Sequence, residues 1–365
     1  MTSILPGTCS SLNPSRRKFL SGAATVLIAA PAIVSSVRSY AAPSVLDGAG
    51  IDYDKAKAEG PVRLWYSDQE PDVVEYCKVF TDKTGIPVQQ LRLATGAALP
   101  KLKAELQTGN VSVDVFNCTD DGLFDQLREE GLLLKYETSA LSAYGKQYKS
   151  ADPGYWTTFY INVGPMAYDT RFVSEADAPK VWEDLLNPRW QKQIGVQVAS
   201  AGSQYAWWYN LKEVVAPDFW TKLAAQKPRS YATSNQLMND VNSGSLKIGG
   251  KVSIFQYTKA VRAKTPLKIV LPPAGTPASN AVTGVIAASP RPNAAKAFVH
   301  YLLSQEGQQA WNDIQGSLSA RSDVKIAELP SLSDTKILVP TDFQDYRSAK
   351  RHKEFETIWN KVVGF

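Results

Sequence analysis

Three strand-like stretches early in the chain end in polar residues that can hold a ligand by hydrogen bonds. The stretches are Val62–Tyr66, Val88–Leu93 and Val111–Phe116. The candidate binding residues at or just beyond their ends are Ser67, Asp68, Arg92, Thr95, Gly96, Thr119 and Asp120. Hydroxyl, backbone and carboxylate groups of this kind hold polar molecules. Arg92 would add a positive charge, with a surface arginine paired to an acidic residue as its alternative role. The set contains no nucleophile paired with a base, so it indicates capture of a solute without chemistry.

Helix-like patterns alternate with these strands and complete a βαβαβα unit. Apolar residues recur at helical spacing in Pro71–Lys83, in the segment around Leu102 and in Gly122–Glu130. In an open, mostly parallel α/β sheet, ligands bind beyond the carboxyl ends of the strands, and helix N-termini offer free N–H donors there. We therefore expect the three turns to meet at one edge of a sheet. For each single hydroxyl, ordinary helix capping is the alternative role.

A second strand–turn–helix unit lies further along the chain. Strand Ile194–Val198 precedes a turn of small and hydroxylated residues and the helix Gln204–Val215, and Val252–Tyr257 is expected to form another strand. The candidate binding residues of this part are Ser200, Gly202, Ser203 and Tyr257, together with Tyr160 from the aromatic stretch Trp156–Asp169. Core packing is the alternative role of the two tyrosines. The ligand would thus be held between two groups of polar turns.

The first 41 residues have the pattern of an export signal. The basic segment Ser15–Leu20 precedes an alanine-rich apolar run, and Ser39–Ala41 places small residues where a signal peptidase cleaves. The paired arginines specify the twin-arginine route. A membrane anchor is disfavoured because Pro31 and Arg38 leave fewer than about 20 uninterrupted apolar residues. We expect residues 1–41 to be removed and the mature protein to reside in the periplasm.

Removal of the signal also changes the charge balance. The first 41 residues carry four of the 40 basic side chains and none of the 35 acidic ones, which leaves 36 basic residues and a formal net charge of +1. Binding of nucleic acid or of a membrane surface needs a clustered basic face. The short basic run Lys350–Lys353 is followed at once by acidic residues. We therefore expect no nucleic-acid partner, and a monomer.

Motifs for catalysis or metal binding are missing from the sequence. It has two histidines, and it lacks the Gly-x-Ser-x-Gly, His-Glu-x-x-His and phosphate-loop patterns. The pair Asp120 and Asp121 is better explained as a helix cap and a surface charge than as an acid–base pair. We expect no enzyme activity, metal or cofactor, with a periplasmic hydrolase or lyase as the alternative. Cys77 and Cys118 remain after export and are expected to be buried free thiols rather than a disulfide.

The order of these features predicts an α/β fold of two interleaved lobes, joined by extended crossings near residues 157–169 and 266–275. A long helical region over Asn293–Ile314 follows the second crossing. In this order the chain resembles the extracellular solute-binding proteins of ABC importers, in the branch of the ferric-iron, 2-aminoethylphosphonate and thiamine binders. The segments that carry the resemblance are Tyr66-Ser67, Thr95–Leu102, Val113–Phe116, Gly131–Leu133, Val181–Trp190 and Ala294–Gln308.

The resemblance implies a type 2 periplasmic-binding-protein fold, whose two lobes close by a hinge around a solute. Lobe 1 would comprise residues 42–160 and 271–365, and lobe 2 residues 161–270. The partners would be a small polar or anionic organic solute and the membrane subunits of an ABC permease. Ferric iron is the alternative cargo. Iron-binding members of the family use adjacent tyrosines where this chain reads Phe255-Gln256-Tyr257-Thr258, so only Tyr257, with Tyr160 as a second phenol, would remain.

Overall fold

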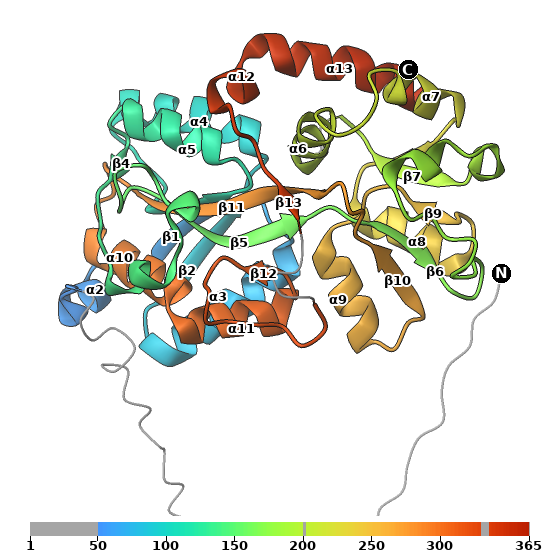
Figure 1. The fold of residues 1–365 in the computed structure, drawn as a ribbon. Helices are drawn as coiled ribbons and strands as arrows, with labels where there is room; N and C mark the ends of the chain where they lie inside the picture. The colour runs from blue at the N-terminus through green and yellow to red at the C-terminus, as the bar shows by residue number, and fades with distance from the viewer. Residues whose placement is uncertain (1–49, 200–201, 330–335, 365) are drawn as a thin grey trace, which may run out of the picture. The chain divides into compact units, whose positions relative to one another are not determined.

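The computed structural model describes residues 50–199, 202–329 and 336–364. Within this part the chain forms an eight-stranded and a five-stranded sheet, called here the larger and the smaller sheet (Figure 1). The predicted signal over residues 1–41 and the candidate Ser200 lie outside the described residues. None of the described helices is long and apolar enough to cross a membrane.

The larger sheet contains the early strands that carry the predicted turns. Its strand order is β12-β5-β11-β3-β1-β2, and the short strands β4 and β13 pair with β11. Strand β1 pairs in parallel with β2 and β3, whereas β11 is antiparallel to β3 and β5. The strands are β1 Val62–Tyr66, β2 Val88–Arg92, β3 Val115–Cys118, β4 Leu133–Leu134, β5 Thr157–Val163, β11 Thr276–Ile286, β12 Leu318–Ser319 and β13 Ile337–Leu338. The parallel β2-β1-β3 set brings the three predicted turns to one edge.

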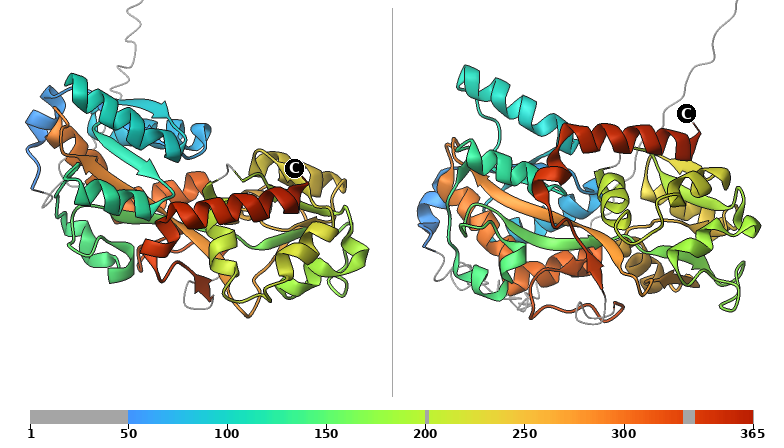
Figure 2. Two further views of the ribbon diagram at one scale, coloured as in Figure 1. Left: turned by 90° about the horizontal axis from the view of Figure 1, so that it is seen from above. Right: turned by 45° about the horizontal axis from the view of Figure 1, so that its top comes forward.

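Helices cover both faces of the larger sheet (Figures 1 and 2). One face packs on the helices α2 Tyr53–Ala58, α3 Glu70–Thr84, α10 Pro292–Leu303 and α11 Gln305–Gln315, with Phe80, Phe298 and Trp311 in the shared core. The other face packs on α4 Thr95–Thr108 and α5 Asp121–Glu129, where Phe116 stacks on Phe124. Burial on both faces explains why β1 and β3 are almost continuously buried.

The smaller sheet has the strand order β10-β6-β9-β7-β8 and is likewise covered on both sides. Its strands are β6 Met166–Asp169, β7 Ile194–Gln197, β8 Arg229–Tyr231, β9 Ile248–Gly249 and β10 Leu267–Val270. Its helices are α6 Gly202–Leu211, α7 Phe219–Ala225, α8 Ser234–Ser243, α9 Ile254–Arg262 and the C-terminal α13 Ala349–Val363. A cluster containing Trp207, Trp208, Trp220 and Trp359 packs on one side, and a smaller one around Leu237 on the other.

The chain passes between the two sheets more than once. Strand β5 of the larger sheet leads into β6 of the smaller one, and β10 leads back into β11. Near the C-terminus, α12 Phe343–Arg347 contacts α5 through an Arg347–Asp125 ion pair of 2.6 Å, whereas α13 packs against α6 and α7 of the smaller sheet. The boundaries proposed for the two lobes stay a prediction.

Three expected elements differ from the structure. The expected strand Val252–Tyr257 is wrong, because Ser253 begins helix α9, whose buried Ile254, Phe255 and Thr258 recur at helical spacing. The third early strand lies further along than expected, at Val115–Cys118. The long helical region is divided into α10 and α11 at Ser304, whose hydroxyl accepts a hydrogen bond from the Gly307 N–H and caps the second helix.

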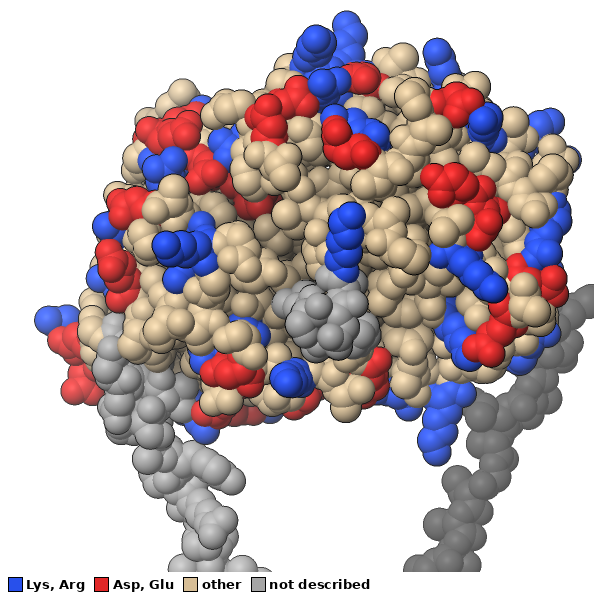
Figure 3. All heavy atoms as spheres, in the orientation of Figure 1, with Lys and Arg blue, Asp and Glu red and all other residues tan. Residues whose placement is uncertain are grey.

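The expectation of a surface charge at Asp121 is wrong, because this side chain is buried and accepts a hydrogen bond from Asn280 Nδ2 at 3.0 Å. On the face drawn in Figure 3, lysine and arginine are interspersed with aspartate and glutamate. Cys77 and Cys118 are both free and buried, as expected. Burial raises the pKa of the Cys77 thiol to about 12 and that of Cys118 well above its usual value, which keeps both thiols protonated.

Candidate ligand-binding site

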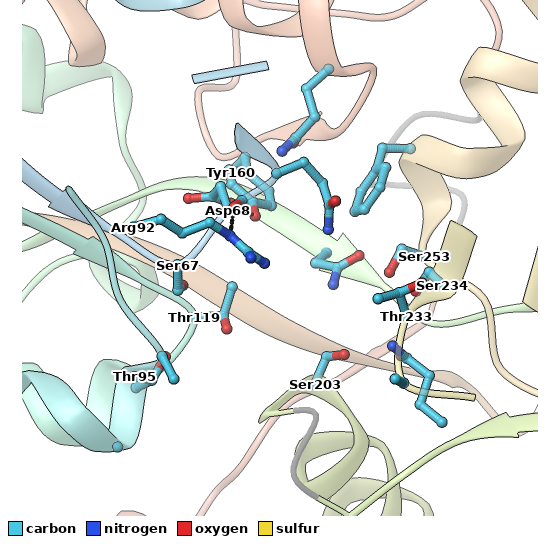
Figure 4. Close-up of a pocket in the computed structure, with 18 residues that line it drawn as sticks. Ser67, Asp68, Arg92, Thr95, Thr119, Tyr160, Ser203, Thr233, Ser234 and Ser253 are labelled. Carbon is cyan, nitrogen blue, oxygen red and sulfur yellow. Dashed lines mark hydrogen bonds between the residues drawn. The ribbon is translucent and has the colours of Figure 1, made fainter. Parts of the chain in front are cut away.

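A cavity of about 340 Å³ lies between residues of the two sheets. Figure 4 shows the polar side chains that line it. The larger sheet and its turns contribute Ser67, Asp68, Gln69, Arg92, Ala94, Thr95, Gly96, Thr119, Tyr160, Asn162 and Gln315, and the smaller sheet and its helices contribute Gln197, Ser203, Ala232, Thr233, Ser234, Ser253 and Phe255. Its volume is within the usual range for small-molecule sites, about 300–1,000 Å³.

Most of the predicted binding residues line this cavity. They are Ser67, Asp68, Arg92, Thr95, Gly96, Thr119, Tyr160 and Ser203. The structure brings them together because β1, β2 and β3 end at one edge of the larger sheet, β5 passes beside them, and α6 begins opposite. Figure 4 shows Thr119, Ser67 and Thr95 on one side and Ser203 on the other.

The structure places other candidates away from the cavity lining. Asp120 accepts a hydrogen bond from the Leu123 N–H at 3.0 Å and caps α5, which is the alternative role considered for such residues. Tyr257 lies on α9 and packs against the apolar clusters of both sheets. Gly202 is the first residue of α6.

Several helices begin at the cavity. The lining residues include Gln69 and Ser253, which immediately precede α3 and α9, and Thr95, Ser203 and Ser234, which lie in the first turns of α4, α6 and α8. Neither Gln69 nor Ser253 uses its side chain to cap its own helix. The N–H groups of a first helical turn have no partner within the helix, and the peptide dipoles make that end attractive to negative charge. The arrangement favours oxygen-rich or anionic ligands.

A buried carboxyl–phenol pair lies at the larger-sheet side of the cavity. The Tyr160 hydroxyl donates a hydrogen bond to Asp68 Oδ1, and both side chains are buried. Asp68 Oδ2 is also buried but has no hydrogen-bond partner among the described residues. Burial raises the pKa of Asp68 to about 6, although hydrogen bonding to Tyr160 and to the nearby Gln315 side chain acts in the opposite direction. Oδ2 is thus a buried acceptor of a residue that lines the cavity.

Arg92 supplies the positive charge at this side. Its Nε donates to the backbone oxygen of Asp68 at 2.9 Å, the hydrogen bond drawn in Figure 4, and its side chain extends into the cavity. The guanidinium is thus oriented by a backbone contact rather than by an acidic partner. A guanidinium held in this way can bind an anionic oxygen group with its remaining N–H donors.

Sequence analysis missed the cavity residues on the smaller-sheet side, apart from Ser203. Thr233 caps α8 by accepting a hydrogen bond from the Gln236 N–H at 3.2 Å. The dipeptide Thr233-Ser234 directly before the apolar positions of α8 was a usable signal for such a cap. Ser253 and Phe255 were hidden by the wrong strand assignment. Gln197 is the last residue of β7, and nothing in its sequence context marked it as a binding residue.

Metal binding gains no support from the described residues. They contain no group of three or more histidine, cysteine, aspartate or glutamate side chains able to hold a metal ion. The two candidate phenols do not share the cavity. Tyr257 is not among its lining residues, and the Tyr160 hydroxyl donates its hydrogen bond to Asp68. Burial, together with the nearby Asp68 carboxylate, raises the pKa of Tyr160 well above its usual value.

Comparison with known families identifies the chain. The sequence profile of the bacterial extracellular solute-binding proteins matches residues 110–348, more than half of the sequence. The chain belongs to this family. As a member, it is a binding protein associated with transport.

Individual relatives agree with the fold of this solute-binding protein. The Fe(3+)-binding periplasmic protein of Serratia marcescens is 22% identical over 296 residues, which cover 77% of this chain and 86% of the relative. Iron-bound HitA from Pseudomonas aeruginosa has a TM-score of 0.70 at 20% identity, covering 83% of this chain and 99% of that one. AfuA from Actinobacillus pleuropneumoniae, with exogenous fructose-6-phosphate bound, has a TM-score of 0.71 at 19% identity and covers 84% and 99%.

These likenesses confirm the predicted type 2 periplasmic-binding-protein fold. The ligands bound to these two neighbours differ, one being iron and the other a sugar phosphate. The fold alone therefore does not determine which ligand binds, and the side chains of the cavity must make that selection.

Proposed function

We propose that the cavity between the two sheets captures a small organic solute with an anionic group, and that the protein delivers it to the membrane subunits of an ABC importer. The observation that carries the proposal is the set of helix N-termini meeting at one polar cavity, with Arg92 extending into it. The export signal over residues 1–41 would place the protein in the periplasm by the twin-arginine route.

The cavity walls provide complementary groups for such a solute. Hydroxyls of Ser67, Thr95 and Thr119 lie near Arg92 and can donate to phosphoryl or carboxylate oxygens. The unpartnered Asp68 Oδ2 can accept a hydrogen bond from a hydroxyl or amine elsewhere on the solute. A molecule with an anionic end and a donor end would use both features.

Closure of the lobes would couple capture to delivery. A solute held by the larger-sheet side shifts the open–closed equilibrium only by its additional contacts with the smaller-sheet side. Those contacts would come from Ser203, Ser234 and Ser253 on the opposite wall. Because the family is one of binding proteins, release of an unchanged solute is the expected outcome. Conversion of a bound solute over many turnovers would instead support the hydrolase or lyase alternative.

A thermal-shift screen followed by calorimetry tests this function. The panel comprises sugar phosphates with their free sugars, phosphonates, carboxylates, polyamines, thiamine and ferric citrate. A ligand that binds only the native state raises its apparent stability by mass action. Anionic organic solutes should raise the unfolding temperature, and their uncharged counterparts should do so far less. A response confined to polyamines or neutral compounds would contradict the proposal.

Substitution at Arg92 provides the matched test of the site. Arg92→Gln should weaken binding of the best anionic solute about tenfold or more, as expected for loss of a charge-assisted hydrogen bond. Arg189→Gln removes a charge from an arginine that pairs with Asp177 and does not line the cavity, and should leave the affinity unchanged. Equal affinities in both variants would place the ligand elsewhere.

Ferric iron remains the second candidate because the Serratia relative and HitA are described as iron-binding. A phenolate–iron charge-transfer band on addition of ferric citrate, lost in Tyr160→Phe, would support iron as the cargo. Stabilisation by citrate alone, without that band, would support the anionic solute.

A further inference from the structure

Lys251 lies directly behind the smaller-sheet wall of the cavity. It is located between β9 and α9 and is only 2% exposed. Its Nζ is 2.9 Å from Gln197 Oε1 and 2.6 Å from Ser203 Oγ, and both of these residues line the cavity. The ammonium is therefore separated from the cavity by a single layer of two side chains.

No carboxylate among the described residues balances this lysine. Within the described part of the chain, its hydrogen bonds go to the neutral acceptors Gln197 and Ser203, and it forms no ion pair there. The titratable groups that line the cavity, namely Asp68, Arg92 and Tyr160, all belong to the opposite wall. Burial lowers the pKa of Lys251 to about 7, because an ion without a counter-ion is costly inside a protein.

The surroundings leave the side chain little freedom to turn away. A Cβ added to Gly164, which follows β5, would lie 3.3 Å from both Cγ and Cε of Lys251, so the lysine stem occupies the space beside that glycine. Gln197 is held as well, since its N–H donates to Gln204 Oε1 at 3.2 Å and its backbone oxygen accepts from Trp359 Nε1 at 2.8 Å. The contact between Lys251 and the cavity wall is thus built into the core of the smaller sheet.

The chemistry of an ammonium determines what the two wall residues can offer. A lysine ammonium only donates hydrogen bonds, so the Gln197 carbonyl and the Ser203 oxygen must accept from it. The Gln197 amide N–H and the Ser203 O–H then remain as donors toward a ligand. We propose that Lys251 is a specificity-determining positioning residue, which orients these two donors toward the cavity and supplies the buried positive charge for an anionic group of the phosphate, phosphonate or carboxylate type.

This inference rests on the proposed function, and it extends that function by assigning the charge selection to a residue outside the cavity lining. It predicts that simple orthophosphate binds at the wall without the rest of the solute. Calorimetric titration of orthophosphate at pH 7 into the wild type, Lys251→Met and Lys268→Met tests it. Lys268 is exposed on β10 of the same sheet and pairs with Glu175, so its variant removes the same charge without touching the wall.

The expected result is a dissociation constant at least tenfold higher in Lys251→Met and within about twofold of the wild type in Lys268→Met, which corresponds to at least about 1.4 kcal/mol for the wall lysine. Equal affinity in Lys251→Met would overturn the inference while leaving solute capture intact. So would a wild-type protein that ignores orthophosphate but binds an organic solute of the panel. If every member of the panel fails to bind, the proposed function itself is overturned.

A second readout separates positioning from a merely structural role. Anion binding stabilises the charged lysine, so at pH 8 the wild type should take up a proton on binding, seen as a binding enthalpy that depends on the ionisation enthalpy of the buffer. Lys251→Met should lose that dependence. If Ser203 and Lys251 act as one unit, adding Ser203→Ala to Lys251→Met should weaken orthophosphate binding little further. If Lys251→Met fails to fold, the titration of Lys251 in the wild type can be followed by NMR with and without orthophosphate. A pKa near the ordinary lysine value that does not change with orthophosphate would overturn the inference.

Discussion

The two walls of the cavity differ in the buried group that can carry a charge, which is a carboxyl on one side and an amine on the other. On the larger-sheet side, the Asp68 carboxyl receives a hydrogen bond from Tyr160 and keeps one oxygen unpartnered. On the smaller-sheet side, the Lys251 ammonium donates to two neutral acceptors. The acid lies in the cavity lining, whereas the base lies one side chain behind it.

The comparison shows how burial prepares opposite groups for one ligand. Burial raises the pKa of Asp68 to about 6 and lowers that of Lys251 to about 7. Both shifts disfavour the charged form. A solute that brings a donor to Asp68 and an anion to the Lys251 wall would restore both charges. Without ligand, a variant that replaces either group with an uncharged side chain should therefore be more stable than the wild type where that group is charged.

The largest effect is expected from Lys251→Met on stability as a function of pH. The folded-state pKa of Lys251, about 7, lies below the ordinary value of 10.5, so between these limits only the unfolded chain binds the proton. Wild-type stability should therefore gain up to about 1.4 kcal/mol per pH unit from this group as pH rises from 7 to 10. Urea unfolding of both proteins at several pH values measures this, and Lys251→Met should lack that gain. If the free energies of unfolding of the two proteins changed with pH in parallel, the folded-state pKa of Lys251 would not be lowered.

Asp68→Asn should have the next largest effect, and at the opposite end of the pH range. The pKa of Asp68 is raised from 3.8 to about 6. Between these pH values the folded protein keeps a proton that the unfolded chain releases, so the stability of the folded protein falls as pH rises. Asparagine avoids this cost and can still accept from Tyr160, so the variant should be more stable at pH 7 by about 1–3 kcal/mol. Urea unfolding at pH 4 and pH 7 checks it, with a difference expected only at the higher pH.

Tyr160→Phe sharpens the same side of the comparison with an effect of similar size and opposite sign. It removes the hydroxyl that donates to Asp68 Oδ1 while preserving the stacking of the ring on Trp311. Loss of one hydrogen bond to a charged group should cost about 1–3 kcal/mol at pH 7 and less at pH 4, where Asp68 is protonated. The apparent pKa of Asp68, followed by NMR, should rise further. An unchanged Asp68 titration would mean that the phenol does not support the carboxylate.

The larger-sheet wall could be predicted from the sequence, and the smaller-sheet wall mostly could not. The strands that precede Ser67, Thr95 and Thr119 are parallel neighbours. The local sequence pattern and the rule that ligands bind beyond strand ends were therefore enough to predict that these residues lie close together. Gln197 and Lys251 meet through long-range packing between β7 and the segment before α9. A buried lysine without an acidic partner leaves no local pattern, because its role is set by surroundings distant in sequence.

The wrong strand at Val252–Tyr257 has a physical cause as well. Its alternating apolar residues fit a strand, but the short segment after Gly249-Gly250 is followed by Ile254, Phe255 and Thr258 at helical spacing. Short apolar runs do not distinguish a buried strand from a buried helix by periodicity alone. The error hid Ser253 and Phe255 from the predicted site and added Tyr257 to it.

Tyr257→Phe is the smallest expected effect and tests that geometry directly. In a strand, residues 253, 255 and 257 would face the same side, whereas in a helix residue 257 is turned away from residue 255. Helix α9 places Ser253 and Phe255 at the cavity and Tyr257 against apolar clusters. We therefore expect solute affinity within about twofold of the wild type and a stability change within about 0.5 kcal/mol for this peripheral hydroxyl, while Phe255→Ala weakens binding. A large loss of affinity in Tyr257→Phe would imply that the tyrosine reaches the solute, and the smaller-sheet wall would then have to be built from the other face of α9.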